Sequence, residues 1–185
     1  MRVKNLVFLL GLFAGDVAQA QNGNAIQADY RAVPSLRHHL PINIPEAQDL
    51  DSKRLRDLEC LSWNLYFEAR GGIRDEQIAV AWVPINRANH PSFSRDICTN
   101  VFQYAWAGNG RRQYQFSWAG IVRGQNWRRE EETWRRMQIV ALQVYRGELP
   151  DPSRGAIYFH HARLAHSWAP NARKTRLGSH VFWRN

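Results

Sequence analysis

The stretch that decides the fold is LSWNLYFEARGGIRDEQIAVAWVPINR, residues 61–87. Leucines spaced three and four residues apart predict one apolar face of a helix, which consists of Leu55, Leu58, Leu61 and Leu65 and ends at Glu68. Gly71 and Gly72 end this helix, because glycine is the usual residue after a helix C-terminus. A second helix is expected to follow, with Asp75 as its cap and a kink or an early end at Pro84.

Glu68 is an unusual residue for the end of an apolar face. Burial disfavours the charged form of a carboxyl group and raises its pKa, and the partial negative charge of a helix C-terminus acts in the same direction. Glu68 is therefore suited to act as a general acid near neutral pH. The alternative is a helix-end ion pair with Arg70, Arg74 or another arginine, which on position alone is the commoner arrangement.

The N-terminus has the pattern of a secretory signal peptide. A basic start, MRVKN, precedes the apolar run LVFLLGLFAG, and Ala18-Gln19-Ala20 supplies a cleavage site after Ala20. An uncleaved membrane anchor is the alternative, but the run is short for a bilayer span. Residues 21–50 contain three prolines and no sustained period, so we expect a flexible spacer there and a single catalytic domain over residues 51–185.

The chain is strongly basic, with a formal net charge of +9. Removal of residues 1–20 takes away Arg2, Lys4 and Asp16 and leaves +8. Such a charge favours polyanionic partners: nucleic acid, anionic lipid or an anionic cell wall. A solvated basic face with no specific partner is the alternative, and charge alone does not choose among these.

Cys60 and Cys98 are the only cysteines of the chain. In an exported protein two cysteines most simply pair with each other, so we expect a disulfide between the first helix and the loop after the second. Such a bond stabilises the fold by roughly 3–4 kcal/mol in the chain-entropy model.

The remaining segments predict a mainly helical α+β domain. Residues 107–126 are rich in glycine, amides and aromatics, which favours a loop or β-hairpin on a binding surface. A further helix is expected from about Arg129 to Arg146, with a buried stripe made of Trp134, Met137, Val140, Ala141 and Val144. Residues 155–161 and 178–183 have the composition of strands.

Several motifs occur in an order that resembles the SleB-like cell-wall hydrolase family, the catalytic domain of spore cortex-lytic enzymes. The family pattern is a cysteine, then Tyr-x-Glu-Ala-Arg-Gly, then Gly-Gln-x-Ala-Val-Ala and an Asn-Arg pair. The matching residues are Cys60, Tyr66, Glu68, Ala69, Arg70, Gly71, Gln77, Ala79, Val80, Ala81, Asn86 and Arg87. Residues 90–93, 98–103, 115–118, 155–160 and 178–182 resemble the later motifs, so the resemblance covers roughly residues 55–183. Each piece is weak alone, but their order is specific.

The resemblance implies a lysozyme-like single domain, with a short β-hairpin or sheet beside the active-site groove and Glu68 as the catalytic acid. It implies cleavage of the MurNAc–GlcNAc β-1,4 bond of peptidoglycan, often with formation of a 1,6-anhydro sugar. Three features depart from the pattern: Gly72 replaces a usual glutamate, Pro84 replaces an aliphatic residue, and a second cysteine pair is missing near Tyr114 and Ala119.

One carboxylate is consistent with a lytic transglycosylase. A usual glycoside hydrolase needs a second carboxylate, but Asp75, Glu76 and Asp96 have the positions of caps or surface charges. A transglycosylase does not need one, because the muramyl 6-hydroxyl attacks in place of water. Hydrolysis assisted by the acetamido group of the substrate is the alternative that also needs no second carboxylate. The candidates for binding the sugar are Gln115, Ser117, Trp118, Tyr158, His160 and Asn86, of which Asn86 could equally be structural.

No metal or other cofactor is expected. The histidines of the C-terminal part lack the spacing and the carboxylate partner of a zinc site. His160 and His161 face opposite sides of a strand, and His160 has the family-like position. The alternatives are a hydrolytic muramidase, a non-catalytic basic wall-binding module, a secreted nuclease and a zinc amidase. We expect peptidoglycan as the partner, without nucleic acid and without a membrane span after signal removal.

Overall fold

The computed structural model describes residue 42 and residues 44–120, 130–164 and 172–184. The expected signal peptide and most of the expected spacer lie outside these residues. The described part begins before the expected domain boundary at residue 51. Ile44 and Ala47 are buried in the core, and Arg146 donates hydrogen bonds to the carbonyl of Glu46 and to Asp49. Residues 44–50, including the short 3-10 helix η3 (Pro45–Ala47), therefore belong to the packed domain.

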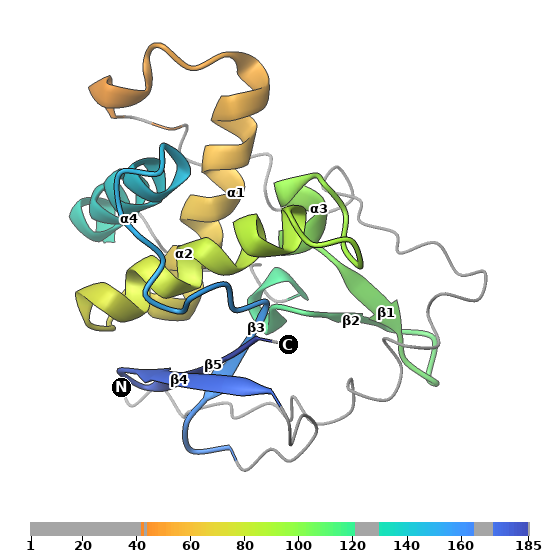
Figure 1. Cartoon of the computed structure of the whole chain (residues 1–185). Coiled ribbons are helices and arrows are strands. Elements are labelled where there is room, and N and C mark those ends of the chain that lie inside the picture. Colours follow the sequence, from red (N-terminus) through yellow and green to blue (C-terminus); the bar gives the residue numbers. More distant parts are fainter. Residues whose placement is uncertain (1–41, 43, 121–129, 165–171, 185) are drawn as a thin grey trace.

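Helices form most of the core. They are α1 (Ser52–Ala69), α2 (Arg74–Ala88), α3 (Ile97–Val101) and α4 (Glu131–Tyr145). Helix α1 packs against each of the other three, as Figure 1 shows. The leucine face of α1 and the stripe of α4 lie as predicted, because these apolar side chains are removed from water where the helices meet. Asp51 caps α1, its side chain accepting a hydrogen bond from the Arg54 backbone.

Helix α2 differs from the expectation in two details. Its N-cap is Ile73, without a side-chain cap, and Asp75 lies inside the first turn. The helix also continues through Pro84 to Ala88. Pro84 is itself buried, and its neighbours Val80, Ala81 and Val83 are fully enclosed. Burial on several sides of α2 thus outweighs the roughly 3 kcal/mol that an internal proline costs.

Two small antiparallel sheets complete the described fold. Strands β1 (Tyr104–Trp106) and β2 (Arg112–Tyr114) form a hairpin, which begins three residues before the region 107–126 in which a loop or hairpin was expected. Strands β3 (Tyr158–His161), β4 (Arg173–Leu177) and β5 (His180–Arg184) form a sheet of order β3-β5-β4. Strand β4 was not predicted: its sequence, RKTRL, is highly charged, as suits an edge strand that faces water.

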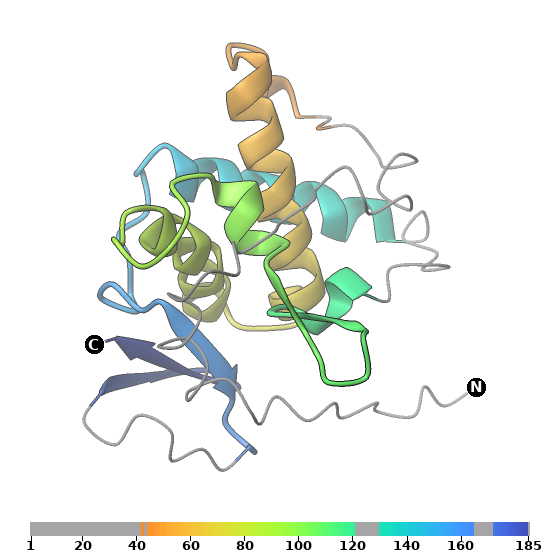
Figure 2. The ribbon, with the colours of Figure 1, turned by 90° about the vertical axis from the view of Figure 1, so that its right-hand side faces the viewer.

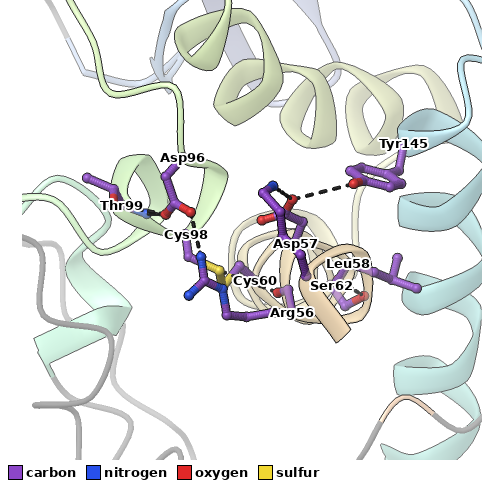
Figure 3. The surroundings of a disulfide bond; sticks show 10 residues. Arg56, Asp57, Leu58, Cys60, Ser62, Asp96, Cys98, Thr99 and Tyr145 are labelled. Carbon is purple, nitrogen blue, oxygen red and sulfur yellow. Dashed lines mark hydrogen bonds and ion pairs between the residues drawn. A yellow bond between two sulfur atoms is a disulfide. The ribbon is translucent and has the colours of Figure 1, made fainter. Parts of the chain in front are cut away.

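The predicted disulfide between Cys60 and Cys98 is present and joins α1 to α3. Beside it, Arg56 pairs with Asp96, which caps α3 by accepting from the Thr99 backbone (Figure 3). On another side of α1, Tyr145 of α4 donates to Asp57 across 3.4 Å. The N-terminal half of α1 is therefore connected to α3 and α4 by covalent and polar contacts.

The C-terminal end of α1 lies on the side of the molecule where the sheets are. Figures 1 and 2 show the helices above and the two sheets below, with the hairpin extending away from the lower end of α1. The expected mainly helical α+β fold is confirmed. Within the described residues, none of the helices has the length and apolar character needed to cross a membrane.

Candidate active site

Glu68 occupies the last turn of α1, and the chain reverses directly after it. Gln77 of α2 holds this reversal, because its side-chain amide donates to the carbonyls of Ala69 and Gly72, each across 3.2 Å. The Ala69 carbonyl also accepts from the Gly72 backbone, so the side chain of Gln77 adds to the backbone contact that closes the turn. The last turn of α1 is thus fixed against the first turn of α2.

The carboxyl group of Glu68 is electrostatically distinct. Burial raises its pKa to about 7. Among the residues that the structure describes, no hydrogen bond or ion pair to this carboxyl group is present. Arg70 pairs with Glu130 at 3.2 Å, and Arg74 donates to Gln143. The helix-end ion pair with Arg70 or Arg74 is therefore not formed, and Glu68 can hold a proton near neutral pH.

Arg70 instead connects the end of α1 to the start of α4. Its guanidinium lies 4.7 Å from the centre of the Tyr66 ring, and the Tyr66 hydroxyl donates to Glu130 across 3.0 Å. Burial, together with this bond to Glu130, raises the pKa of Tyr66 to about 12. Glu130 is therefore engaged by two side chains of α1.

Glu76 corrects an expectation from sequence: it is neither a cap nor a surface charge, since only 2% of it is exposed. Its Oε1 accepts from the backbone and hydroxyl of Ser179, at 3.0 and 2.6 Å, and contacts Nδ1 of His180 at 2.6 Å. Burial alone would raise the pKa of Glu76, but the hydrogen bonds from Ser179 and His180 outweigh it and lower the pKa. Glu76 is therefore a charged carboxylate whose Oε1 is held by Ser179 and His180.

The space around Glu76 requires glycine on two sides. A Cβ at Gly72 would lie 2.3 Å from its Oε2, and a Cβ at Gly178 would lie 2.2 Å away. Glu76 thus fills the gap between the α1–α2 turn and the β4–β5 turn. Local sequence patterns did not reveal this, because the partners lie about a hundred residues apart in the chain.

The other carboxylates with described polar partners also have structural roles. Asp57 binds Lys53, and Asp96 is a helix cap. Asp151 accepts from the backbones of Ser153 and Gly155 in the loop before β3. All Asp and Glu residues after residue 41 fall in the described part of the chain. Burial raises the pKa of Glu68, whereas hydrogen bonds lower the pKa of Glu76 and of Asp96 in that part of the chain.

The segment Gln115–Trp118 connects the end of α1 with strand β3. The Trp118 ring, in the 3-10 helix η4 (Ser117–Gly120), stacks on Phe67 with 4.9 Å between ring centres. Phe116 lies 5.8 Å from Phe159 of β3. Three predicted sugar-binding residues therefore lie on a segment in contact with the neighbour of Glu68. Ser117 is exposed, Gln115 is half-buried, and Trp118 is buried with its flank against Phe67.

Strand β3 places Tyr158 and His160 on one face and His161 on the other. His160 is buried beside Trp183 at 5.5 Å, whereas His161 lies 5.7 Å from His180. The opposite orientation of the two adjacent histidines is thus as predicted. Tyr158 is half-buried, and burial raises the pKa of its hydroxyl.

Asn86 and Arg87 hold the chain that leads into β3. The Asn86 amide donates to Asp151 and to the carbonyl of Ala156, at 2.9 and 3.0 Å. Its amide nitrogen is therefore used in the structural role that the sequence left open. Arg87 donates to the carbonyl of Ile157 across 2.7 Å.

Arg87 of the Asn-Arg pair is also a buried cation, which its sequence pattern does not indicate. It is 3% exposed, and its guanidinium lies 5.2–5.4 Å from the ring centres of Phe93, Phe116 and Tyr158. Burial lowers its pKa to about 10, so it stays charged at neutral pH. Its contacts with Phe116 and Tyr158 join the 115–118 segment to β3.

No three His, Cys, Asp or Glu side chains in the described ranges are grouped in a way that could hold a metal ion. The chemistry that the arrangement supports is proton transfer by a single carboxyl group at a helix end. Aromatic and amide side chains from η4 and β3 lie on the segments connected to that end.

Comparisons with known proteins point to one family. A family model described as cell wall hydrolase matches residues 72–183. The match begins four residues after Glu68. A spore cortex-lytic enzyme of Halalkalibacterium halodurans is 31% identical over 129 residues, which is 68% of this chain and 34% of the relative. A spore cortex-lytic enzyme of Bacillus subtilis is 28% identical over 129 residues, 68% of this chain and 37% of the relative. The chain thus spans about a third of the length of these curated relatives.

A solved structure supports the fold. The catalytic domain of the germination-specific lytic transglycosylase SleB from Bacillus anthracis matches with a TM-score of 0.52 and 24% identity. The match covers 76% of this chain and all of that domain. At this identity the likeness concerns the fold, which is that of a SleB catalytic domain.

Proposed function

The chain belongs to the cell wall hydrolase family, and from this premise we propose that it cleaves the glycan strands of peptidoglycan. The relatives named spore cortex-lytic enzymes support this substrate, as does the net charge of +9, which favours an acidic polymer. We further propose that the reaction is that of a lytic transglycosylase, with Glu68 as both general acid and general base.

In the proposed reaction Glu68 starts in its protonated form. It donates its proton to the glycosidic oxygen as the bond between that oxygen and C1 of MurNAc breaks. The resulting carboxylate then takes the proton of the muramyl 6-hydroxyl as O6 bonds to C1. The products are a free GlcNAc 4-hydroxyl and a 1,6-anhydro end. Glu68 regains its proton, and no water is consumed.

The observation that carries this proposal is the contrast between Glu68 and the other carboxylates. Glu68 has a pKa of about 7 and no polar partner among the described residues. Glu76, which is buried and follows in the next helix, is engaged by Ser179 and His180. A hydrolase would need a further group to activate water, usually a carboxylate. Attack by the substrate's own hydroxyl requires only the acid that is present.

The sugar-orienting roles follow from the segments around Glu68. We assign them to Gln115, Ser117, Trp118, Tyr158 and His160. Ser117 is exposed and can contact a ligand directly, whereas Trp118 is buried and supports Phe67. We also propose that the protein is exported, because the N-terminal pattern and the Cys60–Cys98 disulfide both suit an oxidising compartment.

Mass spectrometry of muropeptides released from purified sacculi tests the function. Wild type should release products lighter by one water than hydrated muropeptides, and Glu68→Gln should release none. Glu132→Gln removes an exposed carboxylate of α4 and should behave like wild type. Hydrated products that are lost in Glu68→Gln would favour the muramidase. If wild type binds sacculi but cleaves nothing, the protein would be a non-catalytic wall-binding module.

A further inference from the structure

The β1–β2 hairpin exposes an aromatic ring beside a cation. Trp106 is 60% exposed, and Ile73 is the other large apolar side chain of the described residues with comparable exposure. Arg112 lies directly opposite Trp106 in the antiparallel register. Its guanidinium carbon is 5.6 Å from the centre of the Trp106 ring and 4.7 Å from that of Tyr104. We call Tyr104, Trp106 and Arg112 the hairpin platform.

The hairpin platform is ordered by contacts around it. Tyr104 is buried, and its ring meets those of Trp106 and Tyr114 at 5.6 Å each. The loop closes with a hydrogen bond from the Ala107 backbone to the Arg111 carbonyl at 2.8 Å, and Gly110 adopts a φ of 73°. A single exposed apolar residue is common on protein surfaces. Here, however, the indole belongs to a packed row of rings and a cation on a fixed backbone.

The hairpin platform is continuous with the candidate active site. Strand β2 runs directly into the segment Gln115–Trp118, and Trp118 stacks on Phe67 next to Glu68. Figure 2 shows that the hairpin extends away from the C-terminal end of α1. The hairpin thus begins beside the segment that contacts the end of α1 and points away from it.

The charge around the hairpin platform favours an acidic ligand. Residues 97–120 contain no Asp or Glu, and they include Arg111 and Arg112. Arg111 and Arg112 are exposed. A guanidinium binds a carboxylate in a forked geometry, and it also stacks on aromatic rings. The ring face itself suits the C–H face of a sugar.

We propose that the hairpin platform binds a glycan unit of peptidoglycan at a distance from the scissile bond. The sugar stacks on Trp106, and Arg112 pairs with a carboxylate of the attached peptide stem. The inference rests on peptidoglycan as the proposed substrate, but not on the cleavage step. Trp106 and Arg112 would then determine how tightly long strands bind. The proton transfer at Glu68 would not depend on either residue.

The test compares Trp106→Ala with Ile73→Ala in the full-length protein. Ile73 is the matched control because it is 57% exposed and lies outside the hairpin. We expect Trp106→Ala to weaken sedimentation with purified sacculi by roughly five- to tenfold, whereas Ile73→Ala should bind as wild type does. Trp106→Tyr, which keeps a flat ring, should recover most of the binding. Thermal melting by circular dichroism checks that each variant is folded.

Two further measurements separate the possible failures. On a soluble tetrasaccharide with two peptide stems, which spans little beyond the scissile bond, Trp106→Ala should keep the wild-type kcat/KM. Arg112→Gln should weaken binding to sacculi most at low salt, because it removes a charge contact. If wild type binds sacculi through Trp106 but cleaves nothing, the proposed reaction fails and this inference stands.

The inference is overturned if Trp106→Ala binds sacculi as wild type does. It is also overturned if the substitution impairs the short and long substrates equally, since the residue would then act at the scissile bond. A third result against it would be that Trp106→Ala loses binding to a single-stranded oligothymidine that wild type binds, while its binding to sacculi is unchanged. Stacked aromatic and basic residues also suit single-stranded nucleic acid, and that ligand would then be favoured.

Discussion

Glu68 has a pKa of about 7 in the folded protein, because burial disfavours its charged form. In the proposed reaction the protonated form is the reactive one. The rate of strand cleavage should therefore be constant below this pKa and decline above it, by about tenfold per pH unit once Glu68 is ionised. A group that had to be ionised would give the opposite slope.

The measurement is the initial rate of muropeptide release between about pH 5 and pH 9, at substrate concentrations below KM. Circular dichroism at each pH confirms that the protein remains folded. A rate that rises through pH 7 would contradict the role of Glu68 as the initial acid. Trp106→Ala should show the same midpoint on the soluble tetrasaccharide, since the hairpin platform is separate from the proton transfer.

At the scale of elements, the contact between α2 and the β4–β5 turn depends on the absence of two side chains. In Gly72→Ala the new Cβ would lie 2.3 Å from Glu76 Oε2 and 3.3 Å from the carbonyl oxygen of Ala69. Glu76 cannot move away without loss of its bonds to Ser179 and His180. We expect Gly72→Ala to lower the free energy of unfolding by about 2–4 kcal/mol, measured by urea denaturation.

Gly71 provides the matched control, because a Cβ there meets nothing within 4 Å. Gly71→Ala should change the free energy of unfolding by less than about 0.5 kcal/mol. The double variant Gly72→Ala with Glu76→Ala should lose less than the sum of the single losses, because it removes the clash. If Gly71→Ala and Gly72→Ala changed the free energy of unfolding equally, Glu76 would not limit the space for a side chain at position 72.

The elements that sequence predicted best are those with a local cause. Helices α1 and α4 follow from apolar stripes, and the raised pKa of Glu68 follows from its place at the end of one stripe. Strand β4 has no such pattern, because most of its side chains face water. Pro84 predicted a kink from local chemistry, whereas burial of the surrounding helix kept α2 intact.

The candidate site was predictable to the same extent. The motif around Glu68 and the 115–118 segment could be located from sequence, since each is a short run of residues. The roles of Glu76 and Arg87 could not, because their partners come from distant elements: Ser179 and His180 for Glu76, and the Phe116 and Tyr158 rings for Arg87. Acidic residues in the first turn of a helix usually face solvent. The sequence around Glu76 therefore does not predict that this side chain is buried.

At the scale of the whole molecule, the disulfide joins α1 to α3 across 38 residues. The bond lowers the conformational entropy of the unfolded chain, so its loss should reduce the free energy of unfolding by about 3–4 kcal/mol. A reductant should therefore lower the urea midpoint of wild type. The double variant Cys60→Ala/Cys98→Ala should unfold near the midpoint of reduced wild type, and a reductant should not change its midpoint. A wild-type midpoint that does not respond to full reduction would contradict this contribution.

Glu76 and Gly72 also have a consequence for how relatives of this protein can vary. The carboxylate of Glu76 occupies the volume that a side chain at position 72 would enter, so the two positions cannot change independently. An alignment of homologues should then show covariation at these two positions, with a side chain at one and glycine at the other.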